Sequence, residues 1–272
     1  MNDILMVSHF HKDFPFNHHS TWMRAAFAGG KYPYGWHPPG LGGNWTNTTQ
    51  QNSIHEYMHY YSGCHEDEFL RAMGQQASEY YLWKYGQADF IGCTTYRRYL
   101  KLDDDMHPSV VKISMEPTYG NTNHLSSDVM GDKALTILQN HDIITNRITP
   151  LPCSVIDQYL QSQPKEYIEL FLNGIYELMP DYRSKMDWWY GNEASFETCY
   201  IMRKQLFRKY VSELFELLEY VWKNAKTAYP RVPTTSEPLP WRYPGFLGER
   251  FLPFFIQVND LNASRLPLVI LA

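Results

Sequence analysis

Short apolar runs closed by polar residues predict the strands of this chain. Residues 3–9 (Asp-Ile-Leu-Met-Val-Ser-His) and 89–94 (Asp-Phe-Ile-Gly-Cys-Thr) have this pattern, and residues 142–145 form a shorter candidate. Such runs are typical of strands in a parallel sheet that is covered on both faces. Ligands of such sheets bind beyond the carboxyl ends of the strands. His9 and Lys12, at the end of the first run, are therefore candidate ligand-binding residues.

Apolar positions at helical spacing predict helices between and after these strands. The clearest helix covers residues 205–224, and further helical patterns cover 53–84 and 158–178. The apolar stripe of the clearest helix comprises Phe207, Val211, Leu214, Leu218, Val221 and Trp222. Strands that alternate with helices predict an α/β fold. We expect a single Rossmann-type domain over residues 1–272, with a mainly parallel central sheet and a helical C-terminal part.

Three stretches lack a regular pattern. Residues 31–52 are rich in Gly, Pro, Trp and Asn, and residues 230–244 contain five prolines. Both compositions predict surface loops. The weak periodicity of residues 101–140 suggests a variable insertion, and residues 31–52 are a second candidate for one.

Composition narrows the classes of function. Hydrophobic residues make up 44% of the 272 residues and charged residues 19%, so the chain can form a substantial core. A net charge of −5 argues against a general nucleic-acid binder, which carries a basic excess. The four cysteines form no Cys-x-x-Cys pair and indicate buried thiols in a reducing compartment. The chain opens without a signal-peptide pattern and has no run of membrane-spanning length, which predicts a cytoplasmic protein with at most peripheral membrane association.

The most informative segment ends the second predicted strand. Directly after Thr95 the chain reads Tyr96-Arg97-Arg98-Tyr99. Guanidinium groups bind phosphate oxygens bidentately, and tyrosine can stack on a base or hydrogen-bond a sugar. An ordinary surface arginine pair is the alternative. Because adjacent strand residues point to opposite faces, both arginines serve one site only if the strand has already ended.

Residues 89–100 (Asp-Phe-Ile-Gly-Cys-Thr-Thr-Tyr-Arg-Arg-Tyr-Leu) resemble the signature of a family of bacterial capsule and O-antigen cluster glycosyltransferases, long catalogued as a domain of unknown function. That signature is an aspartate, an apolar strand with glycine, and His-Tyr-Arg-Arg-Tyr. Thr95 stands here in place of the histidine, and Thr198 stands where the family tends to have asparagine. Four further blocks resemble the family in order: residues 7–12 (ending His-Lys), 79–84 (ending Trp-Lys), 200–207 (Tyr-Ile-Met-Arg-Lys-Gln-Leu-Phe) and 245–250 (Gly-Phe-Leu-Gly-Glu-Arg).

The resemblance implies a GT-A-like fold, a nucleotide-sugar donor such as a UDP-sugar, and a glycan or lipid-linked acceptor. The process would be surface polysaccharide synthesis at the inner face of the membrane. Some relatives are linked to galactose or galactofuranose transfer. In this interpretation the donor is bound by His9, Lys12, Tyr96, Arg97 and Arg98.

The counter-charge to the donor diphosphate has two open interpretations. Many GT-A enzymes use a divalent cation held by an Asp-x-Asp at a strand end. Either the arginines replace that metal here, or Asp103 and Asp105 of the run Asp103-Asp104-Asp105 bind Mg²⁺ or Mn²⁺ through hard oxygen ligands. An aspartate run that merely forms a solvated turn is the structural alternative.

Inverting transfer requires a carboxylate base near the acceptor hydroxyl. Asp187, Glu193 and Glu249 are the candidates, and Glu249 is favoured because it lies in a matched block. A buried ion pair with Arg250 or another arginine is its alternative role. The pair Trp188-Trp189 could form an acceptor platform or belong to the core.

One motif points to a different class of protein. His55-Glu56-Tyr57-Met58-His59 would place two zinc ligands one helical turn apart, with Glu56 as general base. His65 has the spacing of the third ligand in metzincin proteases, but Ser62 stands where their helix breaks at glycine. A zinc metalloprotease and a non-catalytic sugar-binding module are therefore the alternatives to a transferase.

Overall fold

A six-stranded sheet forms the centre of the computed structural model, which describes residues 3–10, 22–27, 76–95, 97–102, 110–113, 125, 127–196, 198–225 and 243–271. The strand order is β10-β6-β9-β3-β1-β2. These strands are β1 (Ile4–Phe10), β2 (Met23–Phe27), β3 (Phe90–Thr95), β6 (Ile143–Asn146), β9 (Tyr200–Arg203) and β10 (Ala263–Leu266). The sheet is mixed: β9 runs antiparallel to its neighbours β3 and β6, and the other five strands share one direction. The three strands predicted from apolar runs are confirmed to within one residue.

Two smaller sheets extend this centre. One contains β4 (Arg98–Leu100), β11 (Leu268–Leu271) and β5 (Val110–Ile113) in the order β4-β11-β5. The other pairs β7 (Thr149–Pro150) with β8 (Glu193–Ala194). Because β4 follows β3 almost directly, the Tyr-Arg-Arg-Tyr segment connects the central sheet to the first of the small ones.

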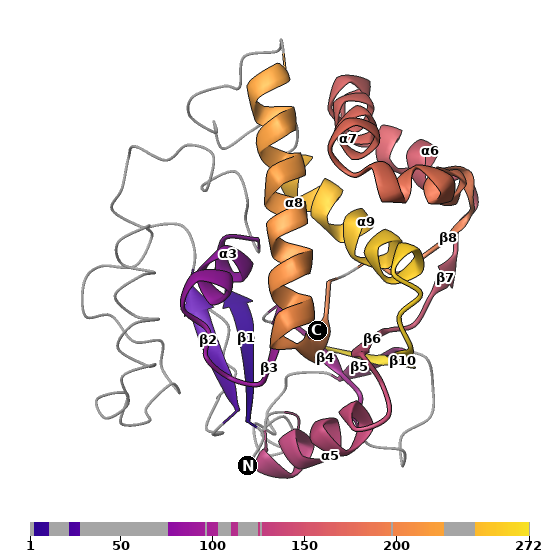
Figure 1. The fold of residues 1–272 in the computed structure, drawn as a ribbon. Helices are drawn as coiled ribbons and strands as arrows, with labels where there is room; N and C mark the ends of the chain where they lie inside the picture. Colours follow the sequence, from indigo (N-terminus) through magenta and orange to yellow (C-terminus); the bar gives the residue numbers. More distant parts are fainter. Residues whose placement is uncertain are drawn as a thin grey trace.

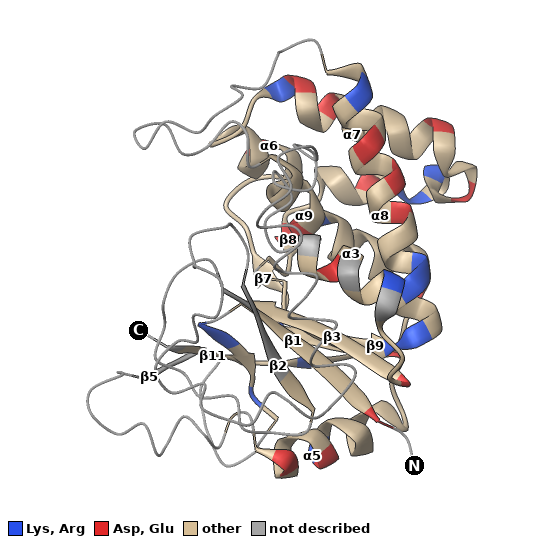
Figure 2. Ribbon diagram, turned by 90° about the vertical axis from the view of Figure 1, so that its left-hand side faces the viewer, with Lys and Arg blue, Asp and Glu red and all other residues tan. Residues whose placement is uncertain are grey.

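Helices cover the central sheet on both faces. They are α3 (Gln76–Tyr85), α5 (Asp128–Leu138), α6 (Val155–Leu160), α7 (Lys165–Leu178), the 3-10 helix η2 (Pro180–Tyr190), α8 (Lys204–Asn224) and α9 (Tyr243–Val258). The helices α3, α8 and α9 lie over one face, and α5 lies under the other (Figures 1 and 2). The predicted helical C-terminal part is thus confirmed.

The long helix α8 forms for the reason its sequence indicates. Its predicted stripe is buried against the sheet and against α7 and α9, and only Trp222 of the stripe stays partly exposed. The predicted helix over residues 158–178 is in fact two helices, because Pro164 occupies the N-cap of α7 and cannot continue α6. The helix α6 begins at Ser154, whose side chain accepts a hydrogen bond from the Asp157 amide (3.0 Å).

The range 101–140 contributes to the core, although its periodicity is weak. Met130, Ala134 and Leu138 of α5 are buried against the sheet at a spacing of four residues. The Trp22 indole donates to the carbonyl of Ser127 (2.9 Å) and so ties the start of α5 to the segment before β2. The interpretation of this range as a variable insertion stays a prediction.

The first four residues of β3 pair closely with β9. At Gly92 a β-carbon would collide with the carbonyl oxygen of Tyr200, so this pairing requires a glycine. No helix in the described ranges combines the length and the apolar character needed to cross a bilayer.

Candidate functional site

Polar residues line up where the central strands end. The register places Ser8 beside Thr94 and His9 beside Thr95 at the ends of β1 and β3. Because β9 runs antiparallel, its first residue lies at this same edge, beside the end of β6, which terminates in Asn146. Open α/β sheets bind their ligands beyond the carboxyl ends of their strands. We therefore take this carboxyl edge as the candidate site.

The arginine pair follows the carboxyl end of β3 directly. The strand ends at Thr95, Arg97 lies in the connecting turn and is exposed, and Arg98 is half-buried as the first residue of β4. The Thr94 hydroxyl donates a short hydrogen bond to the carbonyl of Arg98, which shapes this turn. Since the strand has ended before Arg97, the condition under which both arginines can serve one site is met. Tyr96 falls outside the described residues.

Tyr99 has a structural role next to the arginines. It is buried, and its hydroxyl lies 3.4 Å from the Ser8 hydroxyl, so it fastens β4 to β1. Burial raises the pKa of its phenol well above the usual range. The backbone of His9 lies at the carboxyl edge, whereas Lys12 is not among the described residues.

The other half of the edge is formed by the end of β6 and the segment 195–199 that leads into β9, of which Glu197 is not among the described residues. The Asn146 side-chain amide donates to the carbonyl of Phe196 (2.6 Å), and the Thr145 hydroxyl donates to the carbonyl of Cys199 (3.3 Å). Of the candidate bases, Glu193 is exposed in β8, just before this segment. Asp187 is exposed in η2, and the structure does not bring it to the edge.

The expected acceptor platform at Trp188 and Trp189 needs a correction. Trp189 is fully buried, and its ring packs against Phe171 (5.9 Å between centroids) and Phe254 (5.3 Å). Its aromatic faces are therefore used by the core and are closed to a sugar. Trp188 is partly buried and packs on Trp189 and Phe254.

The third candidate base, Glu249, is half-buried in α9. Its charge contributes to raising the pKa of the Tyr210 phenol, after burial and the buried Glu79 and Cys93, which places it near that ring. The start of α9 lies against α3, because a β-carbon at Gly248 would come within 2.5 Å of the Gln76 side-chain nitrogen. The alternative role of Glu249, an ion pair with Arg250, is not seen: the charge of Glu249 raises the pKa of Arg250, but the two are not within ion-pair distance. An ion pair of Glu249 with another arginine stays a prediction.

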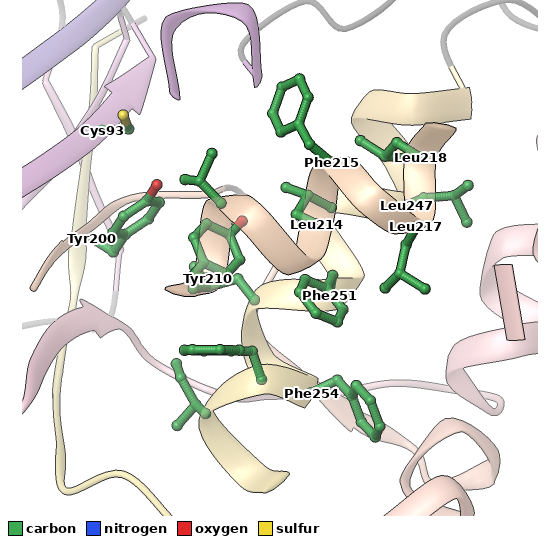
Figure 3. Packing of buried hydrophobic residues seen from close by; sticks show 14 of the residues in the cluster. Cys93, Tyr200, Tyr210, Leu214, Phe215, Leu217, Leu218, Leu247, Phe251 and Phe254 are labelled. Atoms are coloured by element: carbon green, nitrogen blue, oxygen red, sulfur yellow. The ribbon is translucent and has the colours of Figure 1, made fainter. Parts of the chain in front are cut away.

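A buried polar cluster behind the edge was missed by the sequence analysis. The Tyr200 hydroxyl donates to one carboxyl oxygen of Glu79 (2.8 Å), and the other oxygen has no hydrogen-bond partner among the described residues. Burial raises the pKa of Glu79 to about 8 and also raises the pKa of the Cys93 thiol. Figure 3 shows Cys93 and Tyr200 on the side of the sheet that faces Tyr210. Glu79, Cys93 and Tyr200 each lie in a block that resembles the family, but nothing in the sequence indicates that the three side chains meet.

The metal-binding candidates lie outside the described residues. This applies to Asp103 and Asp105 and to the zinc motif with His55, Glu56, His59 and His65. Within the described ranges, His, Cys, Asp and Glu side chains form no group of three that could hold a metal ion. Divalent metal binding therefore stays an open prediction.

Comparison with known proteins shows which fold this chain resembles and to which family it belongs. The structure resembles the apo structure of WbbM, a bifunctional glycosyltransferase, with a TM-score of 0.72 and 16% sequence identity over 100% of this chain. The match covers 46% of that protein, so this chain spans about half of its length, and at this identity the likeness shows the fold alone. No curated protein matches the chain. The model of a family described as a domain of unknown function, DUF4422, matches residues 75–260, well over half of the sequence, and the chain belongs to this family.

Proposed function

We propose that this protein is a glycosyltransferase that moves a hexose, galactose or galactofuranose in the first instance, from a UDP-sugar to a glycan or lipid-linked acceptor in surface polysaccharide synthesis. The observation that carries the proposal is the arginine pair Arg97-Arg98, directly after the carboxyl end of β3, in a fold that resembles a glycosyltransferase. We place the reaction in the cytoplasm, at the inner face of the membrane.

The chemistry of sugar transfer gives each half of the carboxyl edge a task. Negative charge develops on the departing diphosphate, and fixed guanidinium groups stabilise such charge. The β1–β3 side, with His9 and the arginine pair, is the proposed donor side. The β6–β9 side, with the segment 195–199, Glu193 and Glu249, is the proposed acceptor side, where a carboxylate would take the proton of the acceptor hydroxyl.

A thermal-shift screen against UDP-, GDP-, CMP- and TDP-sugars, with and without Mn²⁺, tests this proposal. We expect UDP-sugars to raise the melting temperature most, because a ligand that binds the folded state alone stabilises it. If no nucleotide sugar shifts the transition and the purified protein contains stoichiometric zinc, the proposal is wrong and the zinc metalloprotease indicated by the motif at His55 takes its place.

Transfer activity is expected to persist in EDTA. The strand end carries Thr95 and Arg97, where an Asp-x-Asp would hold a cation, and the arginines can supply the counter-charge themselves. The measurement is UDP release with and without the chelator. Complete loss that Mn²⁺ restores would refute this expectation and point to Asp103 and Asp105.

The substitution Glu249→Gln is expected to lower kcat by about a hundredfold or more, a typical contribution of a general base. Donor affinity should stay unchanged, because the amide keeps the shape of the side chain. The matched variants Glu193→Gln and Asp187→Asn separate the three candidate bases, and Glu219→Gln, on the exposed face of α8, controls for a lost surface charge. Full turnover in Glu249→Gln would move the base to whichever matched variant is inactive.

A further inference from the structure

Arg250 is a buried cation with no counter-ion among the residues that the structure describes. It is 2% exposed in α9, and none of the described carboxylates lies within ion-pair distance of it. Its Nε has no hydrogen-bond partner among the described residues. Burial lowers the pKa of its guanidinium to about 10. Buried charges in proteins are normally paired, so an arginine in this state calls for an explanation other than stability.

The guanidinium of Arg250 joins three elements. Its Nη1 donates to the carbonyl of Phe246 (2.6 Å) one turn earlier in α9, and its Nη2 donates a short hydrogen bond to the side-chain oxygen of Gln158 in α6. The cation also lies over the rings of Phe196 (4.6 Å to the centroid) and Tyr159 (5.1 Å). It therefore holds α9 and α6 to the segment 195–199.

That segment belongs to the candidate site. The carbonyl of Phe196 accepts a hydrogen bond from Asn146 at the carboxyl end of β6, so the residue under the guanidinium is also fixed to the sheet edge. Glu193 stands three residues before Phe196, and Glu249 directly precedes Arg250. Arg250 thus contacts a residue that follows Glu193 closely in the chain, and it lies in the helix that carries Glu249.

We propose that Arg250 is a positioning residue, which sets the segment 195–199 relative to α9 on the acceptor side of the site. The part of this inference that concerns transfer rests on the proposed function. This role requires the planar guanidinium group of arginine. The guanidinium donates two hydrogen bonds in different directions while it stacks on two rings, and a lysine ammonium cannot stack in this way. An apolar residue of similar length would fill the space without the desolvation of a charge.

The test compares Arg250→Met and Arg250→Lys with the wild-type protein. We expect both variants to fold, with Arg250→Met at least as thermally stable as the wild type. The kcat/KM for the acceptor should fall at least tenfold in both, while the affinity for UDP stays within twofold. Arg183→Met and Arg183→Lys are the matched controls, because Arg183 also stacks on a ring (Tyr176, 4.4 Å) and donates to a carbonyl, but on an exposed surface.

Hydrogen exchange supplies a measurement that does not depend on transferase activity. In both Arg250 variants the amides of residues 193–199 should exchange faster, with those of β1 and β3 unchanged. If the wild type transfers no sugar but these amides exchange faster in the variants, the proposed function is wrong, whereas the positioning of the segment 195–199 by Arg250 is supported. Wild-type exchange and kinetics in Arg250→Lys would overturn the inference, as would an equal loss of UDP affinity. Should Arg250→Met fail to fold, Arg250→Lys decides alone.

Discussion

Replacing Arg97 and Arg98 together with alanine is expected to weaken UDP binding by about a hundredfold or more. A hydrogen bond to a charged group contributes roughly 1.5–3 kcal/mol, and a bidentate guanidinium–phosphate contact contains two of them. The turn itself should survive, because the Thr94 hydroxyl donates to the backbone carbonyl of Arg98, which alanine retains. The expected loss therefore reports on the missing guanidinium groups and not on a rearranged strand end.

Titration calorimetry with UDP measures this effect, and two further variants sharpen it. Arg208→Ala removes one arginine charge from the exposed face of α8. The start of this helix lies at the opposite end of β3, since the Lys204 amide donates to the carbonyl of Asp89. Arg208→Ala should therefore bind UDP as the wild type does. The double variant Arg97→Lys with Arg98→Lys keeps both charges but loses the bidentate hydrogen bonds of the guanidinium groups. It should therefore recover only part of the affinity for UDP. Unchanged binding in the double alanine variant would remove these residues from the donor site.

The sequence predicted the fold best where a local pattern and the final burial agree. The apolar runs at residues 3–9 and 89–94 become β1 and β3, because both of their faces are covered in the structure. The strand β9, Tyr200–Arg203, escaped prediction because the helix α8 follows it directly at Lys204, with no turn residues to separate strand from helix. The helix α9 was missed for another reason: it includes Pro244 and Pro253, which ordinarily argue against a helix. It is buried along most of its length, so tertiary packing overrides that local preference.

The candidate site was predictable in part. The position of Arg97 and Arg98 after a strand end could be read from the sequence, because it depends on where one apolar run stops. The burial of Trp189 could not, since an indole beside polar residues suits a surface platform as well as a core. The hydrogen bond between Tyr200 and Glu79 joins residues that are 121 positions apart, and no local sequence pattern predicts it.

This buried carboxyl group should make the stability of the protein depend on pH. The pKa of Glu79 rises from 4.5 to about 8 in the folded state, because burial penalises the carboxylate more than the hydrogen bond from Tyr200 stabilises it. Between these two values the folded state holds a proton that the unfolded state has released. The stability contributed by this group is therefore complete below pH 4.5 and is lost as the pH rises to 8, at about 1.4 kcal/mol per unit.

Glu79→Gln should abolish the pH dependence of stability that this carboxyl group causes, because the amide stays neutral and still accepts the hydrogen bond from Tyr200. As the pH rises, the free energy of unfolding of the variant should increase relative to that of the wild type. The difference should reach about 5 kcal/mol at pH 8. Urea unfolding between pH 4.5 and 9 measures this, and Glu219→Gln, an exposed residue of α8, should leave the pH profile parallel to the wild type. Tyr200→Phe provides the opposite test: it removes the donor and leaves Glu79 buried, so the pH at which stability is lost should move higher. Parallel profiles for the wild type and Glu79→Gln would show that the carboxyl group reaches water in the folded protein.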